Sequence, residues 1–329
     1  MEKVRFLIIG VGGMGREHIR RLLQVPEAEI IALADPSATA IEQVKGRFPD
    51  LANVSVYSDY REAISRVNAD AAIIVSPHSM HFEQGMACLE GGLHVLMEKP
   101  FVDGSENAAH IIAQADTLNK HLAVAYQRHL QGPYIYIRDL IQSGELGNIN
   151  YICAYQAQSW LKGTTGTWRQ NPALSCGGQL NDSGSHLLDV VLWVTGLEPE
   201  SVSAFIDNRG SQVDIDSSVT VRFREGAIAT FNVVGSATIG WHEDVSIHGD
   251  KGTVLFRNDQ IFVAKEGQRE LVEVKDELPA SSDPNRNFVD LILGKVSEPA
   301  APSSCGLRIA RLTEAAWRSA ANGSQVIRI

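Results

Sequence analysis

A strand, a glycine-rich turn and a helix follow one another at the start of the chain, and this order limits what the chain can fold into. Residues 4–15 read Val-Arg-Phe-Leu-Ile-Ile-Gly-Val-Gly-Gly-Met-Gly, so a short apolar run ends in glycines spaced G-x-G-x-x-G, and a helical pattern follows. We expect Gly10 to permit the tight turn, Gly12 to let a pyrophosphate approach the backbone, and Gly15 to let the helix pack closely.

The predicted helix would point free N–H groups and the positive end of its dipole at bound phosphates. We therefore predict a dinucleotide site that uses Gly10, Gly12, Gly13, Met14 and Gly15. Glycine turns are common, so an ordinary turn between a strand and a helix is the alternative.

A second apolar run, 29–34, ends at Asp35, which lies 20 residues after Gly15 (35 − 15). An acid at this distance accepts hydrogen bonds from the adenosine ribose hydroxyls. No arginine stands beside Asp35, so a 2′-phosphate would meet a carboxylate without a cation, which favours NAD over NADP. Asp35 as the cap of a helix over 37–47 is the alternative, and the two roles are compatible.

The 329 residues suggest two domains. Strands and helices alternate over 1–126, which predicts an α/β Rossmann domain with a doubly wound parallel sheet. From 201 to 263 the pattern is strand after strand, which predicts a large, mostly antiparallel open sheet. We assign 127–329 to a substrate-binding and oligomerisation domain, and we leave open that the helix 307–321 packs back on the first domain.

Charge and cysteine usage exclude several classes of partner. The net charge is −10 and there is no basic tract, which argues against nucleic acid and anionic membranes. The four cysteines lie far apart without a C-x-x-C pair, which favours a reduced cytoplasmic setting and no structural zinc. The sequence shows no convincing signal peptide and no apolar stretch long enough to span a bilayer.

Two clusters follow predicted strands, at the sheet edge where an α/β fold binds its ligand. Ser76 and Pro77 end one strand and His81 follows; for His81 we favour a structural ring that bonds a backbone group. The pair Glu98-Lys99 ends another strand, so the Lys99 ammonium would face the crevice and stabilise a developing alkoxide. A Glu–Lys surface pair is the alternative. His78 and His81 have the spacing of two metal ligands, but no third ligand is apparent, and we predict no metal.

A third cluster, Asp182 and His186, precedes an apolar helix, with the two residues four positions apart. A helix that starts near Gly184 would bring them close, as an orienting carboxylate and a titratable base. Asp182 as a helix cap and His186 as a packed aromatic ring are the alternative. Neither Ser183 nor Cys176 lies in a G-x-S-x-G elbow, so a nucleophile is disfavoured.

A fourth cluster, Trp168-Arg169, lies in a long polar loop. Such a pair can stack on a sugar ring and hydrogen-bond its hydroxyls, or it can serve as a contact or hinge between domains.

Together these motifs resemble the Gfo/Idh/MocA family, the family of glucose–fructose oxidoreductase and inositol 2-dehydrogenase. The resemblance covers nearly the whole chain and rests on the glycine turn, on 76–81, on Glu-Lys-Pro at 98–100, and on the D-x-G-x-H motif within 177–189. It implies NAD as cofactor and a C-terminal sheet that forms dimer or tetramer contacts. It also implies oxidation or reduction of a secondary hydroxyl or keto group of a sugar, inositol or related polyol.

The resemblance also implies roles for individual residues. Lys99 would touch the nicotinamide ribose and the substrate, His186 would take the hydroxyl proton, and Asp182 would hold both His186 and the substrate. His129 departs from the family, in which many members carry an arginine at this position. The expected cofactor contacts are Gly10, Gly12, Gly13, Met14, Gly15, Asp35, Ser76, Pro77, His81, Glu98, Lys99 and Gln127; the expected substrate contacts are Lys99, Arg128, Trp168, Arg169, Asp182 and His186.

Two other functions stay open on the same fold. An NAD-dependent glycosidase would oxidise its substrate transiently, without net formation of NADH. A regulator without catalytic activity would bind the dinucleotide only as a signal.

Overall fold

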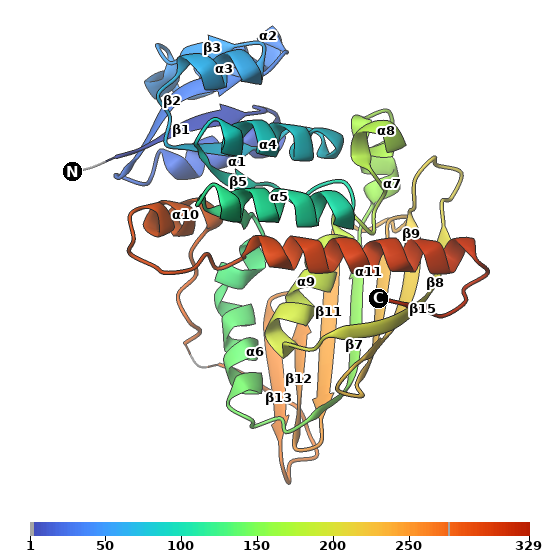
Figure 1. Ribbon diagram of the computed structural model, residues 1–329. Helices are drawn as coiled ribbons and strands as arrows, with labels where there is room; N and C mark the ends of the chain where they lie inside the picture. Colours follow the sequence, from blue (N-terminus) through green and yellow to red (C-terminus); the bar gives the residue numbers. More distant parts are fainter. Residues whose placement is uncertain (1–2, 276) are drawn as a thin grey trace. The chain divides into compact units, whose positions relative to one another are not determined.

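The computed structural model describes residues 3–275 and 277–329, and the chain divides into two compact units. The first unit comprises Met1–Gln127 and Ser282–Leu307, and the second comprises Arg128–Ser281 and Arg308–Ile329. Figure 1 labels the helices and many of the strands of both units. A late segment of the chain thus belongs to the first unit, whereas the sequence pattern had indicated a single break near residue 126.

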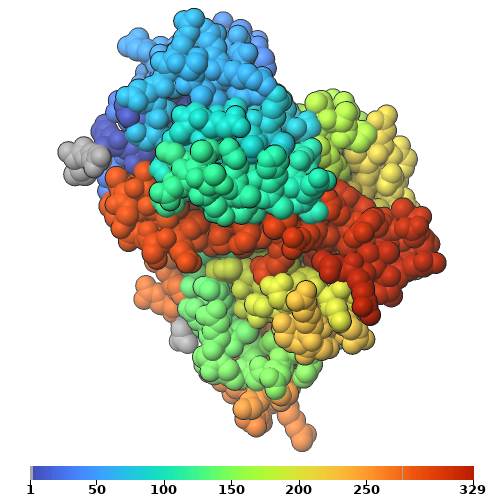
Figure 2. All heavy atoms as spheres, in the orientation of Figure 1, coloured from blue at the N-terminus to red at the C-terminus, as the bar shows by residue number. Residues whose placement is uncertain are grey.

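The first unit contains a six-stranded sheet in the order β3-β2-β1-β4-β5-β6, with every pair parallel. The order reverses beside β1, so right-handed crossovers place α1 and α2 on one face and α3, α4 and α5 on the other. Figure 2 shows the side chains of these last three helices covering their face, coloured from light blue to teal. The strands are β1 (Val4–Ile9), β2 (Ala28–Ala34), β3 (Ser55–Tyr57), β4 (Ala71–Ile74), β5 (His94–Met97) and β6 (Leu122–Val124). The helices are α1 (Gly13–Leu22), α2 (Ala38–Arg47), α3 (Tyr60–Arg66), α4 (His81–Glu90) and α5 (Ser105–Thr117), with short 3₁₀ turns η1 (Pro49–Leu51), η2 (His78–Met80) and η3 (Gln127–Leu130).

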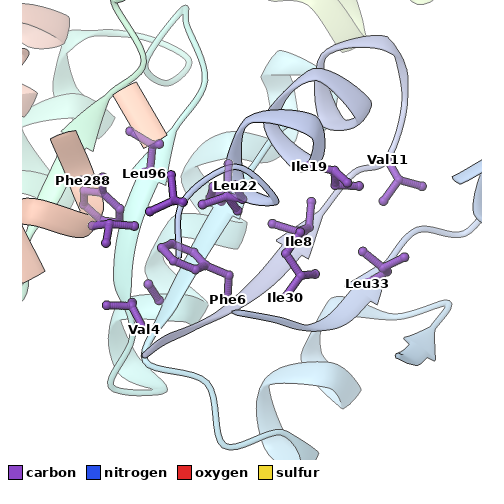
Figure 3. Close-up of a cluster of buried hydrophobic side chains, with 14 of the residues drawn as sticks. Val4, Phe6, Ile8, Val11, Ile19, Leu22, Ile30, Leu33, Leu96 and Phe288 are labelled. Carbon is purple, nitrogen blue, oxygen red and sulfur yellow. The ribbon is translucent and has the colours of Figure 1, made fainter. Parts of the chain in front are cut away.

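Helix α10 (Pro284–Ile292) belongs to the first unit because its apolar face enters the core of that unit. Phe288 packs in the same cluster as Phe6 of β1 and Leu96 of β5 (Figure 3). The carboxylate of Asp283 caps the helix by accepting hydrogen bonds from two backbone amides of its first turn. Burial of this apolar face explains why the segment returns to the parallel sheet.

The second unit contains a nine-stranded sheet in the order β14-β13-β12-β11-β7-β10-β9-β8-β15. All neighbours are antiparallel except β7 and β10. The two sheets confirm the predicted fold class. The strands are β7 (Ile149–Ala157), β8 (Pro199–Asp207), β9 (Asp216–Phe223), β10 (Ile228–Val234), β11 (His242–Gly249), β12 (Gly252–Arg257), β13 (Gln260–Lys265), β14 (Val272–Glu273) and β15 (Ile327–Arg328).

Buried and less buried residues alternate along β9 and β10. One face of this sheet is therefore buried and the other is largely uncovered. Helix α9 (Gly184–Thr195) is buried along nearly its whole length and packs on α6 (Gly132–Gln142) and on β7. The loop before α9, expected to lack regular structure, contains three short turns: α7 (Trp160–Gly163), η4 (Trp168–Gln170) and α8 (Pro172–Ser175).

The last long helix, α11, spans Ser303–Ala321. Among the described residues, no helix combines the length and the apolar character that crossing a bilayer would require.

Candidate active site

The glycine turn joins β1 to α1, and two of its glycines, Gly10 and Gly15, are required for steric reasons. Gly10 has a φ of +89°, and a Cβ there would lie 2.8 Å from the backbone of Val75. A Cβ on Gly15 would lie 2.3 Å from the carbonyl oxygen of Gly10, so only a glycine lets α1 approach the turn. By contrast, a Cβ on Gly12 or Gly13 would have no atom within 4 Å. The strand, turn and helix therefore leave open space directly beside the start of α1.

This open space fits the phosphates of a dinucleotide. Gly12 is the N-cap of α1, and the first turn of the helix carries no acidic side chain. Gly12, Gly13 and Met14 are exposed, so their backbone amides are open to a ligand. Exposed amides at a helix start form the arrangement that binds pyrophosphate.

Asp35 follows β2 and is bonded to the glycine turn itself. Its Oδ2 accepts a hydrogen bond from the Val11 amide at 2.8 Å, and its Oδ1 accepts one from the Ser37 amide at 2.8 Å. Ser37, not Asp35, provides the side-chain cap of α2. Capping therefore does not account for Asp35, and its contact with the adenosine ribose stays a prediction.

His81 joins two loops at the carboxyl edge of the sheet. Its ring is wholly buried; Nε2 lies 3.0 Å from the Ser76 carbonyl oxygen and Nδ1 lies 2.9 Å from that of Pro100. Burial lowers the pKa of His81. The expected structural role is thus present. The expected direct contact with the cofactor is not, because no surface of the ring is accessible, and His81 supports the loops of Ser76-Pro77 and Lys99-Pro100 instead.

Glu98 and Lys99 directly follow β5, and the side chain of Glu98 is buried. The buried Glu98 carboxylate contacts Nε2 of His18 at 2.9 Å and accepts a hydrogen bond from the Lys99 amide at 3.0 Å. Although burial opposes its charged form, the hydrogen bond with His18 and the charge of Lys99 hold the pKa of Glu98 below its usual value. The carboxylate is therefore occupied inside the protein, which disfavours the alternative of an exposed Glu–Lys pair.

Asp182 lies just before α9 in the second unit, and its carboxylate is held by two side chains. Oδ2 accepts hydrogen bonds from Nε1 of Trp160 at 3.1 Å and from Nε of Arg169 at 3.0 Å. The N-cap position of α9 is Ser183, which makes no side-chain cap bond. Asp182 is thus not a helix cap, and its buried charge is stabilised by an indole and a guanidinium.

The loop that carries Trp168 and Arg169 is fixed to the same carboxylate. The Arg169 guanidinium lies 4.5 Å from the centre of the Trp168 ring, and its Nε–H donates to Asp182. The structure therefore brings Trp168, Arg169 and Asp182 together, as their predicted shared role requires. His186 follows in the first turn of α9, with most of its surface buried.

The turn before Asp182 is organised by a buried residue that the sequence reading did not single out. Asp214 accepts hydrogen bonds from the amides of Gly178 at 2.9 Å and Leu180 at 2.7 Å, and from Nε1 of Trp317 at 3.1 Å. Burial raises the pKa of Asp214 despite these donors. This carboxylate fixes the backbone that leads into Asp182.

Ser183, the weakly considered nucleophile, accepts hydrogen bonds from two glutamine side chains. Nε2 of Gln156 lies 2.9 Å from its hydroxyl oxygen, and Gln158 contacts the same oxygen. Neither partner is a base, so the contacts described here give Ser183 no means of activation.

Arg128 and His129 each pair with an acidic residue of the second unit. The buried Arg128 pairs with Glu243 of β11, and the Tyr134 hydroxyl donates to the same carboxylate. The expected direct contact of Arg128 with substrate is therefore not supported by its position. The ring of His129 lies 2.7 Å from the Asp189 carboxylate, so this departure from the family pattern forms a buried pair with the last acid of the D-x-G-x-H-x-x-D segment.

The sequence gives little indication of which residues support the site. His18 lies on the same helical face as Leu22, and a polar residue on a core-facing stripe was the one available hint. Trp160, Asp214 and Glu243 reach their partners across 22, 34 and 115 residues, and no local pattern encodes such contacts.

A parallel sheet with a dinucleotide cradle, joined in one chain to an open sheet with a supported Asp-x-x-x-His pair, defines a two-domain dinucleotide-binding protein of the Rossmann type. Comparison with known families agrees with this class. The model "Oxidoreductase family, NAD-binding Rossmann fold" matches residues 4–126, and the model "GFO/IDH/MocA C-terminal domain" matches residues 134–255. The chain belongs to the Gfo/Idh/MocA family, which confirms the predicted resemblance and the predicted NAD-binding domain.

Individual relatives extend the comparison. The chain is 31% identical over 199 residues to the inositol 2-dehydrogenase of Streptomyces avermitilis, covering 60% of this chain and 54% of the relative. It is 30% identical over 205 residues to the scyllo-inositol 2-dehydrogenase (NADP(+)) IolW of Bacillus subtilis, covering 62% and 55%. The chain thus spans a little over half the length of these curated relatives. The aldose-aldose oxidoreductase of Caulobacter crescentus, solved in complex with glycerol, has a TM-score of 0.88 over 100% of both chains at 21% identity, which shows a shared fold.

Proposed function

We propose that this chain catalyses hydride transfer between the nicotinamide of NAD and a secondary hydroxyl or keto group of a sugar, an inositol or a related polyol. The observation that carries the proposal is the Asp182 carboxylate, held by Trp160 and Arg169 one helical turn before His186. The curated relatives named for inositol oxidation support the substrate class.

The residues of the first unit would hold and orient the cofactor. The open amides beside Gly12 would bind the pyrophosphate, and Asp35 would accept hydrogen bonds from the adenosine ribose. NAD supplies the hydride acceptor when bound. The absence of a cation in the Asp35 turn supports NAD over NADP.

Three residues would remove the proton, orient the substrate and stabilise the developing charge. His186 would remove the proton from the substrate hydroxyl, and Asp182 would orient the hydroxyl and the imidazole. The Lys99 ammonium, which follows β5 at the carboxyl edge of the parallel sheet, would stabilise alkoxide character on the substrate oxygen. In the reducing direction His186 would return the proton. Convergence of Lys99 with Asp182 and His186 is part of the proposal.

An absorbance screen for NADH tests the proposal. Sugars, inositols and keto-sugars are offered with NAD and with NADP side by side, and the Lys99→Met/His186→Ala double variant serves as the control. We expect at least one polyol or sugar to form NADH with the natural chain only. Cleavage of a nitrophenyl glycoside without net NADH would favour the glycosidase alternative, and NAD binding with no turnover on the whole panel would favour the regulator.

We further propose that the chain forms a homo-oligomer through the uncovered face of the nine-stranded sheet. Tyr155, Asn232, Ser218 and Phe205 are paired in register across four adjacent strands, and the two aromatic residues are exposed. Exposed aromatic residues on an uncovered sheet face are typical of an interface. Light scattering coupled to size exclusion tests this, with Phe205→Glu expected to yield monomers.

We also propose that the protein works in the cytoplasm. This location is supported by the four cysteines, all of which are free thiols. Cell fractionation of the natural host, probed with an antibody to the chain, would test it.

A further inference from the structure

The parallel sheet has a second hollow, at the edge opposite the glycine turn. It has a volume of about 540 Å³ and is lined by residues at the amino ends of the strands, including Arg5, Asp70, His94 and Lys120. The glycine turn, Asp35 and Lys99 all lie at the carboxyl ends of the same strands. The hollow is therefore separate from the cofactor cradle, and its volume is in the range of small-molecule sites.

The only carboxylate that lines the hollow is already neutralised within the described chain. Asp70 accepts hydrogen bonds from Nε of Arg5 at 3.0 Å, from Nη2 of Arg5 at 2.7 Å and from the Arg5 amide at 2.8 Å. This bidentate pair uses both carboxylate oxygens and the fork of the guanidinium. The negative charge of Asp70 is thus largely balanced by the Arg5 guanidinium.

Two further cations, Lys3 and Lys120, line the hollow. Among the residues that the structure describes, neither ammonium forms an ion pair or a side-chain hydrogen bond. The net charge of the lining is therefore positive once the Arg5–Asp70 pair is set aside. An uncompensated positive lining in a concave site attracts anions.

His94 adds a directed donor to this surface. Its Nδ1 accepts a hydrogen bond from the His121 amide at 2.9 Å, so the neutral ring must carry its proton on Nε2. Burial, with His121 and Lys120 nearby, lowers the pKa of His94 to about 4, so the ring is neutral at neutral pH. Its Nε2–H has no acceptor among the described residues and is available to a ligand oxygen.

Part of the lining of the hollow is apolar. Ile292 and Leu293, at the end of α10, contribute to it. A ligand that satisfied both parts would have an oxyanion group and a short carbon body.

We propose that this hollow binds the oxyanion group of a small organic anion, with the lysines and His94 as donors and Ile292 and Leu293 against its carbon body. A phosphate monoester and a polycarboxylate are the two sources of such a group. The site is independent of the proposed hydride transfer, because it lies at the other edge of the sheet.

Calorimetric titration of the full chain tests the site, with inorganic phosphate, glycerol 3-phosphate and citrate as probes and chloride to hold the ionic strength constant. We expect at least one probe to bind with a Kd of about 1 mM or tighter. Lys120→Gln and Lys3→Gln should each weaken that binding about tenfold, as expected for loss of a charged hydrogen bond. Lys45→Gln, in the same unit, is the matched control and should bind as the natural chain does.

Two more measurements distinguish binding in this hollow from binding at the cofactor site. The ring proton resonances of His94 should shift on titration with the binding probe, and NAD affinity should be equal in the natural chain and the lysine variants. Glycerol 3-phosphate binding more tightly than citrate would identify the phosphate source, and the reverse would identify the carboxylate source. No binding of any probe at 10 mM (about ten times the expected Kd), or binding that both lysine variants retain, would overturn the proposal.

Discussion

The indole N–H of Trp160 donates to Oδ2 of Asp182 at 3.1 Å, and this oxygen also accepts the hydrogen bond from Arg169. Trp160 is buried, so the contact is shielded from water. We infer that Trp160 is a positioning residue for the acid of the proposed site. Two donors on one oxygen fix the orientation of this carboxylate.

Replacing Trp160 by phenylalanine should reduce kcat about tenfold, because a hydrogen bond to a charged group is lost while the ring bulk stays. The KM for NAD should stay the same, because the glycine turn is untouched. Steady-state kinetics on a substrate from the absorbance screen would measure both. Trp241→Phe, at an exposed indole, is the control, and equal kcat values for the two variants would exclude the positioning role.

Lys99→Met and His186→Ala should each lower turnover at least about 100-fold, the usual size of a proton-transfer contribution. Both variants should still bind NAD, because the glycine turn is untouched. His110→Ala, on the exposed surface of α5, should keep full activity. Natural rates for either Lys99→Met or His186→Ala with an authentic substrate would refute the assigned role.

Gly12→Ala and Gly15→Ala should separate binding from folding. A Cβ on Gly12 enters open space, so stability should stay the same while NAD affinity falls about tenfold through one displaced phosphate contact. A Cβ on Gly15 would meet the Gly10 carbonyl at 2.3 Å, so this variant should lose about 1–3 kcal/mol of stability, as overpacking does. Thermal melts and NAD titrations check both, and a melting loss for Gly12→Ala would contradict the open cradle.

Asp35→Asn should weaken NAD use more than NADP use. The variant removes the negative charge that would repel a 2′-phosphate, and it weakens the bond to the ribose hydroxyls. We expect the ratio of kcat/KM for NAD over NADP to fall about tenfold, in line with one charged hydrogen bond. Because Asp35 also accepts from the Val11 amide, a melting curve must accompany the kinetics. An unchanged ratio would remove Asp35 from cofactor selection.

Glu27 should make the stability of the first unit depend on acid pH. Hydrogen bonds from Arg286 and Lys295 lower the pKa of Glu27 from its ordinary 4.5 to about 2. A depressed pKa stabilises the fold above pH 4.5, and this stabilisation is lost as pH falls from 4.5 toward 2. The melting temperature of Glu27→Gln should therefore lie below that of the natural chain at neutral pH and approach it in that window. Glu90→Gln, at an exposed glutamate of the same unit with no ion pair among the described residues, should show no such convergence.

The geometry of the glycine turn could be predicted from the sequence because its signals are local. The turn at 10–15 needs glycines for steric reasons that act within a few residues or against the neighbouring strand. Asp35 and the pair Glu98-Lys99 also have local signals, because each directly follows an apolar run. Parallel strands bring such ends to one edge, so a pattern along the chain becomes a site in space.

The supporting contacts could not be predicted in the same way. His81 and Arg128 were expected at the ligands, and the structure instead bonds them to backbone carbonyls and to Glu243. The return of α10 to the first unit depends on Phe288 and its neighbours filling a core formed 280 residues earlier in the chain, around β1 (288 − 8).

The sequence by itself determined the order of elements, the glycine cradle, the acid after β2 and the Asp-x-x-x-His pair, because each depends on spacing within one strand or one helical turn. The tertiary structure alone decided which side chains hold these groups. Trp160 reaches Asp182, His18 reaches Glu98, and Asp214 reaches the turn before α9 only after the sheets form. Such contacts arise from packing between distant segments, whose partners no local period encodes.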